Sequence, residues 1–336
     1  MVPTRVRDAG DGLSTPSSNG CLTADRAEVI IICVKRTRRL PLLLCRRVAC
    51  VFISCLFFLS AGCGRSGSQQ PVASTTTIVN VGSDTMVNLA LAWAEAYHEL
   101  HPEISISVTG GGSGTGMAAL INGSTDIANA SRQMKDEELR EAEHAGITPV
   151  EHVVALDAIA VVINPRNPIG ELTIPQISDM YTGRIENWRD VGGEDRPIIL
   201  ASRESNSGTY MYFLENVVRR GDPENDDLFS PESLLLPSSE VIGLEVAHNP
   251  NAIGYDGLGY VTPAQKTVRV AVSKDGPFVA PSIDTVNDGT YPIARPLYIY
   301  TKGEPQGAIK DYLDWITSED GQRIVAELGF VPLPGS

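Results

Sequence analysis

The sequence predicts an α/β protein whose two domains are joined by a pair of long strands. Three observations support this prediction. From residue 75 onward, short β-branched segments alternate with segments of helical periodicity, which is typical of α/β folds. Two apolar β segments, residues 153–164 and 293–300, are longer than their neighbours, and a second α/β set lies between them. A chain of 336 residues is also long enough for two domains.

The first set of elements begins at residue 75. Residues 75–82 (TTTIVNVG) are rich in β-branched side chains and predict a strand. Apolar residues then recur at helical spacing from Met86 to Tyr97, and Pro102 closes this helix. The next predicted elements are a strand at 104–109, a helix at 115–121, a strand at 126–130 and a charged, solvated helix at 135–144. Because strands alternate with helices, we expect a parallel sheet.

The second set lies between the two long strands. It is predicted to contain a helix at 175–181, a strand at 197–202, a helix at 209–218 and a Gly- and Tyr-rich segment at 252–261. Two more helices, 307–316 and 319–328, follow the second long strand. We therefore expect one lobe from residues 75–157 and 290–336, a second lobe from 158–289, and a hinge made of the two long strands.

An export signal is predicted before the folded body. Basic residues at 35–39 and 46–47 precede an apolar run of about 14 residues, 48–61. This run is shorter than the roughly 20 residues of a membrane-spanning helix. We expect residues 1–62 to be a signal peptide region, and we expect the true start to lie near Val34, because residues 1–34 match neither a signal nor a domain.

The signal region ends on small residues before a cysteine. Ser60-Ala61-Gly62-Cys63 resembles a bacterial lipobox, in which the cysteine is lipidated, although the usual leucine three places before it is Ser60 here. A plain signal peptide with an incidental cysteine is the alternative. Residues 63–74 are polar and small, as expected of a tether between a lipid anchor on Cys63 and the body.

Charge and cysteine content exclude several classes of function. Residues 63–336 carry 18 Lys and Arg against 37 Asp and Glu, a net charge of −19, which argues against nucleic acid or anionic lipid as a partner. All six cysteines lie in the first 63 residues, so the body has no internal disulfide and no cysteine-based metal site.

Three predicted strand-to-helix turns carry glycine and small hydroxyl residues. They are GSDT at 82–85, GSGT at 112–115 within the run GGGSGTG, and SNSGT at 205–209. A helix N-terminus has free backbone N–H groups and a partial positive charge, so it can hold an anion without the lysine of a P-loop. Ser and Thr hydroxyls donate further hydrogen bonds. The alternative is that these residues are ordinary helix caps, worth about 1 kcal/mol each.

Two charged residues bear on the identity of the anion. Arg203 lies four residues before Ser207, where its guanidinium could grip an oxyanion, although a surface ion pair with Glu204 is the alternative. Asp126 would accept the proton that phosphate carries near neutral pH and sulfate lacks, if it points inward. A turn or cap role for Asp126 is equally open.

These segments resemble the phosphate-binding proteins of ABC-type phosphate transporters, which have the type II periplasmic binding protein fold. The blocks that carry the resemblance are GSDTM (82–86), GGGSGTGMAALINGSTDIANASR (110–132), YTGRIENW (181–188), SRESNSGTY (202–210), NAIGYDGLGYV (251–261) and YPIARPLYIYTKG (291–303). The resemblance implies two α/β lobes, a two-strand hinge and a ligand cleft between the lobes.

The resemblance also implies a set of phosphate ligands. The positions that match are Ser83, Thr85, Ser113, Asp126, Arg203, Ser207, Gly208 and Thr209, with Asp84, Ser131 and Arg132 as further candidates. One position departs from the family, because Ser205 stands where some members have an aspartate two residues after the arginine. Which group holds Arg203 is therefore open at this point.

The implied function is the binding of inorganic phosphate outside the cytoplasm and its delivery to an ABC permease. A phosphate sensor and a binding protein for another oxyanion are alternatives of the same kind. An exported phosphate-ester hydrolase is a third, but the sequence has no HExxH motif, no G-x-S-x-G elbow and no carboxylate cluster with metal-ligand spacing. We therefore expect a non-enzymatic protein without cofactor or metal.

Overall fold

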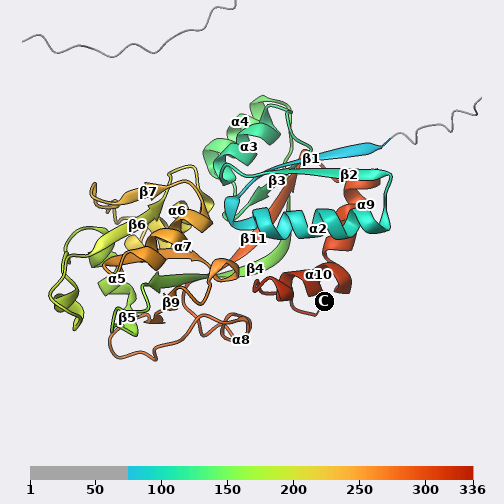
Figure 1. Cartoon of the computed structure of the whole chain (residues 1–336). Helices are drawn as coiled ribbons and strands as arrows, with labels where there is room; N and C mark the ends of the chain where they lie inside the picture. The colour runs from blue at the N-terminus through green and yellow to red at the C-terminus, as the bar shows by residue number, and fades with distance from the viewer. Residues whose placement is uncertain (1–74, 336) are drawn as a thin grey trace, which may run out of the picture. The chain divides into compact units, whose positions relative to one another are not determined.

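One sheet with strands of both orientations runs through the folded body. The structure is a computed structural model and describes residues 75–335, which belong to the compact unit of residues 71–336. The strand order is β2-β1-β3-β11-β4-β8-β6-β7, with β9 paired to β4 (Figure 1). Its strands are β1 (Thr76–Gly82), β2 (Ile104–Thr109), β3 (Ile127–Ala130), β4 (Val150–Ile163), β6 (Ile199–Arg203), β7 (Leu234–Leu236), β8 (Ala252–Gly257), β9 (Lys266–Thr267) and β11 (Ala294–Thr301). A separate two-stranded sheet pairs β5 (Glu171–Thr173) with β10 (Arg269–Ala271).

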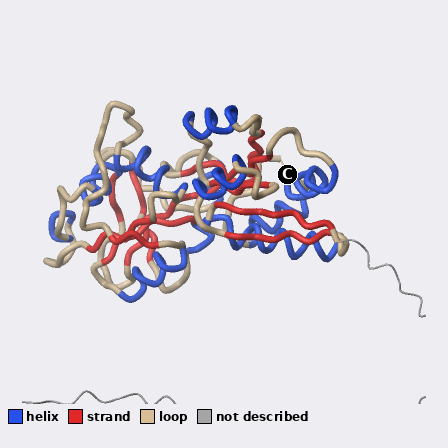
Figure 2. The backbone as a smooth tube through the Cα atoms, turned by 90° about the horizontal axis from the view of Figure 1, so that it is seen from above, coloured by secondary structure: helices blue, strands red, loops and turns tan. Residues whose placement is uncertain are grey.

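Helices lie on both sides of the strands (Figure 2). Those before β4 and after β11 are α2 (Val87–Leu100), α3 (Ser113–Ile121), α4 (Asp136–His144), α9 (Gly307–Ile316) and α10 (Glu319–Glu327). Those between β4 and β11 are α5 (Ile174–Tyr181), α6 (Gly208–Phe213), α7 (Ser239–His248) and α8 (Ile283–Asn287). Short turns of other helix types are η1 (Asp84–Met86), η2 (Trp188–Val191), η3 (Leu214–Val218) and η4 (Leu258–Tyr260).

The strands β4 and β11 connect two groups of elements, which we call lobe 1 and lobe 2. Lobe 1 contains β1–β3 with the first set of helices, and lobe 2 contains β5–β10 with the second set. Residues 150–158 of β4 pair with β11, and residues 159–163 pair with β8. The chain therefore crosses into lobe 2 along β4 and returns along β11 (Figure 1).

The expectation of a wholly parallel sheet is wrong at these crossings. β1 pairs in parallel with β2 and β3, and β6 pairs in parallel with β7 and β8. In contrast, β11 runs antiparallel to β3 and β4, and β4 runs antiparallel to β8. The reason is that the two crossing strands traverse one boundary in opposite directions, whereas the parallel strands are linked by helical crossovers.

Each lobe has its own buried aromatic core. In lobe 1, Trp93 and Tyr97 of α2 pack with Tyr312 of α9 and with Phe330. The indole N–H of Trp93 donates to the carbonyl of Gly321 at 2.8 Å, which joins α2 to α10. The core of lobe 2 is built around Tyr181, Trp188, Phe213 and Tyr255, with the last two rings stacked at 3.8 Å between centroids.

The predicted signal region, the tether and Cys63 lie outside the described residues. Within residues 75–335, no helix is both long enough and apolar enough to cross a membrane. The lobe boundaries predicted from the sequence remain a prediction, and the two cores meet along the same pair of long strands.

Candidate functional site

The candidate site is formed where β1, β2, β3 and β6 end. In the parallel pair β1 and β3, Gly82 lies opposite Asn129, so the loops that follow both strands leave the same edge of the sheet. Carboxyl ends of parallel strands are the usual position of ligand loops in α/β folds. Strand β6 ends at Arg203, and its loop leads into α6 of lobe 2.

Five buried hydroxyl groups meet at these loops, and we call them the hydroxyl cluster: Ser83, Thr85, Ser113, Ser131 and Thr209. The Ser83 hydroxyl donates to Ser131 Oγ at 2.9 Å, and Ser113 Oγ lies 3.3 Å from Ser131 Oγ. Thr85 Oγ1 and Thr209 Oγ1 are 2.7 Å apart. Because Thr85 belongs to lobe 1 and Thr209 to lobe 2, this hydrogen bond joins the lobes.

The capping alternative holds for one of the three loops. Ser207 is the N-cap of α6, and its hydroxyl accepts from the backbone N–H groups of Thr209 and Tyr210. Ser83 precedes η1 without a side-chain cap bond, and Ser113 is the first residue of α3, after Gly112. Ser83 and Ser113 therefore direct their hydroxyls into the cluster and do not cap a helix.

Two glycines allow the loops of the two lobes to touch. A Cβ on Gly208 would lie 2.4 Å from Ser113 Oγ and 2.5 Å from Ser131 Oγ, so a larger residue does not fit. Gly112 has φ of 93°, and a Cβ there would lie 2.7 Å from the carbonyl oxygen of Asn206. The backbone carbonyl of Asn206 accepts from Gly114 N–H at 3.1 Å. The side-chain amide of Asn206 donates to the Gly111 carbonyl at 2.8 Å.

Arg203 is a buried cation with partners in both lobes. Its guanidinium donates to Asp84 Oδ2 at 2.9 Å, to Ser239 Oγ at 3.1 Å and to the Pro237 carbonyl at 3.0 Å. Asp84 also accepts from Gly111 N–H at 3.0 Å. Asp84 therefore holds Arg203 from the opposite lobe, and Ser205, the departure noted in the sequence, is not needed for this. The ion pair with Glu204 does not form in the structure.

The Nε group of Arg203 is buried and has no hydrogen-bond partner among the described residues. A buried donor without a partner costs about 1–3 kcal/mol. This N–H group is therefore a strong candidate for a contact with a bound anion.

Arg295 is a second buried cation at the cluster, and it is not among the site residues predicted from the sequence. It lies on β11 and donates to Asp157 Oδ2 at 3.0 Å, to Thr209 Oγ1 at 2.8 Å and to the Ser131 carbonyl at 2.7 Å. Asp157 lies directly opposite Arg295 on β4. The resemblance block that contains Arg295 was visible in the sequence, but its distance of 86 residues from Thr209 gave no local signal.

Asp126 does not join the cluster, which corrects the expectation that it faces the ligand. It precedes β3, whereas the cluster lies beyond the other end of that strand, roughly 16 Å away for five residues of extended chain. The Asp126 carboxylate accepts from Val79 N–H at 2.8 Å, three residues before β1 ends. Asp126 therefore acts as a local hydrogen-bond acceptor before β3, which is near the turn role that was the alternative in the sequence.

Arg132 lies beside the cluster but is already paired. Its guanidinium donates to both oxygens of Glu138, at 2.6 and 2.7 Å, and to the carbonyl of Gln133. The side chain remains close to the glycine loop, because Nη2 would be 3.7 Å from a Cβ on Gly114. The same guanidinium lines a cavity of about 600 Å³ between α4 and η3.

Two buried carboxylates lie under the arginines. Burial raises the pKa of Asp256 to about 6, although nearby Arg203 and hydrogen bonds from Ser239 and Gly257 act in the opposite direction. Burial also raises the pKa of Asp157, against the attraction of Arg295. Both effects follow from the cost of holding a charge away from water. Neither residue was recognisable in the sequence as a site residue, because each lies inside an apolar β segment.

The chemistry of this arrangement is that of an anion cradle. Hydroxyl groups and two guanidinium groups converge from both lobes, and none of these is a nucleophile with an adjacent base. Among residues 75–335, no group of three or more His, Cys, Asp or Glu side chains is placed to hold a metal ion.

Comparison with known proteins assigns the chain to a family. Residues 68–320 match the family model of the PBP superfamily domain. The chain is 33% identical over 310 residues to the phosphate-binding protein PstS of Pseudomonas aeruginosa, with 84% of this chain and 94% of that protein covered. The chain belongs to the PstS family of the PBP superfamily. It is also 31% identical over 296 residues to PstS of Bacillus subtilis, covering 85% and 93% of the two chains.

Solved structures have the same fold. A phosphate ABC transporter substrate-binding protein of Clostridium perfringens, solved with bound phosphate, is 33% identical with a TM-score of 0.69 and covers 77% of this chain and 100% of its own. An ABC-type phosphate transport receptor of Vibrio cholerae is 28% identical with a TM-score of 0.62, at the same coverage of both chains. The type II periplasmic binding protein fold predicted from the sequence is confirmed.

Proposed function

We propose that this protein binds inorganic phosphate between its two lobes, outside the cytoplasm, and delivers it to the permease of an ABC transporter. The observation that carries the proposal is the meeting of five buried hydroxyl groups and the unpartnered Nε of Arg203 at one junction of the lobes. A tetrahedral oxyanion needs several short hydrogen bonds from different directions, and this junction supplies them. The PstS relatives from two organisms and the phosphate-bound Clostridium perfringens structure support phosphate as the anion.

The proposed ligand contacts come from the turns that follow four strands. Ser83 and Thr85 follow β1, Ser113 follows β2, Ser131 follows β3, and Thr209 is the second residue of α6, after β6. Arg203 adds a charge-assisted contact, and such contacts are about twice as strong as neutral ones. Ser207 and Gly208 contribute by shaping the turn into α6, the first as its cap and the second by its lack of a side chain.

We assign the discriminating carboxylate to Asp84. A carboxylate repels an anion unless the anion donates a proton to it, and phosphate carries such a proton near neutral pH whereas sulfate does not. Asp84 lies between the two hydroxyls that follow β1, and its oxygens already contact Arg203 and Gly111. Asp126 lies at the far end of β3 and cannot perform this role.

The proposal includes export and attachment to a membrane. The basic region, the apolar run and the small residues before Cys63 support export with a lipid on that cysteine. Periplasmic solute receptors close their lobes on the ligand by hinge motion, and β4 with β11 provides the hinge. The net charge of −19 for residues 63–336 would repel an anion. Salt screens distant surface charge over about 10 Å, so the buried neutral donors of the cluster lose little of their attraction for an anion.

Calorimetric titration of the purified protein with phosphate and then with sulfate, near pH 7, tests this function. We expect saturable phosphate binding and no response to sulfate. Asp84→Asn should weaken phosphate binding by about tenfold, or about 1.4 kcal/mol, and should reduce the discrimination against sulfate. Asp126→Asn is the matched control and should bind phosphate like the wild type, because asparagine still accepts a hydrogen bond from Val79 N–H. Absence of phosphate binding by the wild type would refute the proposed function.

A further inference from the structure

The hinge strand β11 places Arg295 in contact with both halves of the hydroxyl cluster. Its Nη1 donates to the carbonyl of Ser131, in lobe 1, at 2.7 Å. Its Nη2 donates to the hydroxyl of Thr209, in lobe 2, at 2.8 Å. The side chain is 2% exposed, so both contacts are made away from water. One guanidinium group therefore spans the junction at which the lobes meet.

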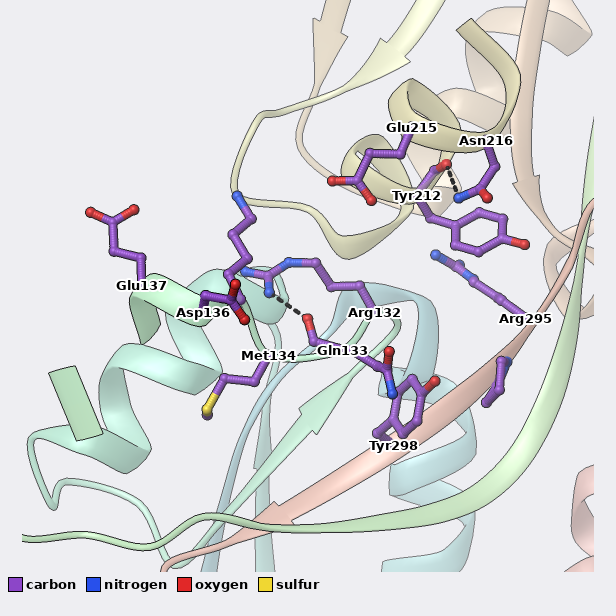
Figure 3. A pocket seen from close by; sticks show the side chains of 12 residues that line it. Arg132, Gln133, Met134, Asp136, Glu137, Tyr212, Glu215, Asn216, Arg295 and Tyr298 are labelled. Atoms are coloured by element: carbon purple, nitrogen blue, oxygen red, sulfur yellow. Dashed lines mark hydrogen bonds between the residues drawn. The ribbon is translucent and has the colours of Figure 1, made fainter. Parts of the chain in front are cut away.

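The neighbouring hinge strand fixes the position of this guanidinium. Asp157 on β4 is the register partner of Arg295 on β11, and its Oδ2 accepts from Nη2 at 3.0 Å and from Nε at 3.3 Å. Asp157 is fully buried, and its other oxygen accepts from Leu258 N–H at 3.3 Å. The ring of Tyr212, from lobe 2, lies over the guanidinium at 5.6 Å from its centroid (Figure 3).

We propose that Arg295 is a positioning residue for the bound anion, which orients the Thr209 hydroxyl toward the ligand and couples the ligand to the hinge. This inference rests on the proposed function. A guanidinium has only donors, so the Thr209 oxygen must accept its N–H, and the Thr209 proton is left to point elsewhere. Thr85 Oγ1 lies 2.7 Å from Thr209 Oγ1 in the cluster, and either hydroxyl can be the donor of that hydrogen bond. Arg295 thus keeps Thr209 as a donor on the side where an anion binds.

Arg295 also removes an unfavourable contact from the site. The carbonyl of Ser131 belongs to the same residue as one of the cluster hydroxyls. A carbonyl oxygen without a hydrogen bond would repel an anion bound nearby. The hydrogen bond from Nη1 occupies that carbonyl. In addition, the guanidinium contributes a second positive charge to the cluster, where a low effective dielectric strengthens it.

Arg295 also lines a cavity whose wall contains residues of both lobes, so its contacts depend on how the lobes are placed. Arg295 lines the cavity of about 600 Å³ together with Arg132 and Lys135 of lobe 1 and Tyr212 and Asn216 of lobe 2 (Figure 3). Hinge motion that separates the lobes changes the distance between Ser131 and Thr209. Arg295 can hold both only when the lobes are together, so its two hydrogen bonds add to the free energy that favours the ligand-bound arrangement.

The test compares Arg295→Lys with the wild type by titration calorimetry, by stopped-flow phosphate dissociation and by thermal unfolding with and without phosphate. Lysine keeps a charge near Asp157 but cannot donate to Asp157, Ser131 and Thr209 in the planar pattern of a guanidinium. We expect the dissociation constant for phosphate to rise about tenfold to fiftyfold, with a faster dissociation rate. The stabilisation that phosphate adds over the ligand-free variant should shrink.

Two further variants separate a positioning role from a structural one. Arg295→Gln combined with Asp157→Asn removes both buried charges together, so neither is left unpaired, and it should weaken phosphate binding at least as much as Arg295→Lys. In a Thr209→Val background, Arg295→Lys should cost less than in the wild type, because the hydroxyl that it orients is gone.

The outcomes distinguish this inference from the proposed function. If the wild type binds phosphate and a folded Arg295→Lys variant binds it within twofold of the wild type, the inference is wrong while the function stands. A lowered ligand-free unfolding temperature with unchanged affinity, or failure of both charge variants to fold, would assign Arg295 to the fold alone and would also overturn the inference. If the wild type itself binds no phosphate, the function fails first.

Discussion

Arg203 and Arg295 are two buried arginines at the same cluster, and they reach it from different parts of the molecule. Arg203 ends a strand of lobe 2 and is held across the junction by Asp84 of lobe 1. Arg295 lies within a hinge strand and is held by Asp157 on the adjacent hinge strand. The first pair exists only when the lobes meet, whereas the second belongs to the hinge itself. This difference is the basis of our proposals that Arg203 contacts the anion and that Arg295 orients the groups around it.

The largest effect on phosphate affinity is expected at Gly208, where the loop that follows Arg203 touches the cluster hydroxyls of lobe 1. Gly208→Ala would place a Cβ within 2.5 Å of the hydroxyls of Ser113 and Ser131, across the junction of the lobes. We expect phosphate affinity to fall at least about a hundredfold, or roughly 2.7 kcal/mol, with little change in the unfolding temperature of the ligand-free protein. Titration calorimetry and thermal unfolding measure the two quantities.

Gly170→Ala is the matched control for this substitution, because a Cβ at Gly170 meets nothing within 4 Å. It should bind phosphate like the wild type. Wild-type affinity in Gly208→Ala would show that the contact between the loops is not needed for binding, and the convergence of the two arginines would then lose its significance.

The next effect compares the contributions of the two arginines to phosphate affinity. Arg203→Lys removes the Nε donor that has no partner among the described residues, and it weakens the bridge to Asp84, Ser239 and Pro237. Loss of a charge-assisted contact to the anion costs about 1.5–3 kcal/mol, so we expect affinity to fall by roughly tenfold to a hundredfold or more. The loss should exceed that of Arg295→Lys when both variants are titrated in parallel. Equal losses, or a larger loss for Arg295, would reverse the roles assigned to the two residues.

The last effect concerns the pH dependence of stability and tests the surroundings of Arg203. Because burial raises the pKa of Asp256 to about 6, the folded state holds its proton more tightly than the unfolded chain, with its ordinary value of 3.8. The contribution of this group to stability is therefore present below about pH 4 and is lost as pH rises through about 6. Relative to the wild type, Asp256→Asn should gain on the order of 2–3 kcal/mol at most between pH 4 and pH 7.

Urea unfolding of both chains at the two pH values measures this difference, and the other carboxylates cancel in the comparison. Parallel stability profiles for the two chains would mean that Asp256 titrates near its ordinary range. In that case the pocket beneath Arg203 is better hydrated than its burial suggests.

Much of the fold was predictable because its signals are local. Periodicity located β1, α2, β2, α9 and α10 within a few residues, since each element carries its own pattern of apolar side chains. Short or irregular elements escaped, among them β5, β7, β10 and the helix α7, whose sequence SEVIGLEVAH has no clear polar face. The antiparallel crossings were also missed, because alternation of strands and helices does not specify how the chain passes between lobes.

The candidate site was predictable in part for a similar reason. Ser83, Ser113 and Thr209 stand in glycine loops that are recognisable in the sequence, and the structure brings their hydroxyls together. The same reasoning failed for Asp126, because spacing along the chain does not state which end of a strand faces the ligand. Strand β3 is only four residues long, yet Asp126 and Ser131 lie at its opposite ends.

The sequence by itself determined that this is an α/β protein of the PstS family with hydroxyl-rich loops after its strands and one arginine beside them. These properties reside in local composition and in blocks of contiguous residues. Only the tertiary structure decided that Asp126 lies away from the cluster, which loops cap helices, and that Arg295 contacts Thr209. The physical reason is that strand pairing and lobe contact join residues more than 80 positions apart, and side-chain direction at those junctions depends on the pairing rather than on the neighbours in sequence.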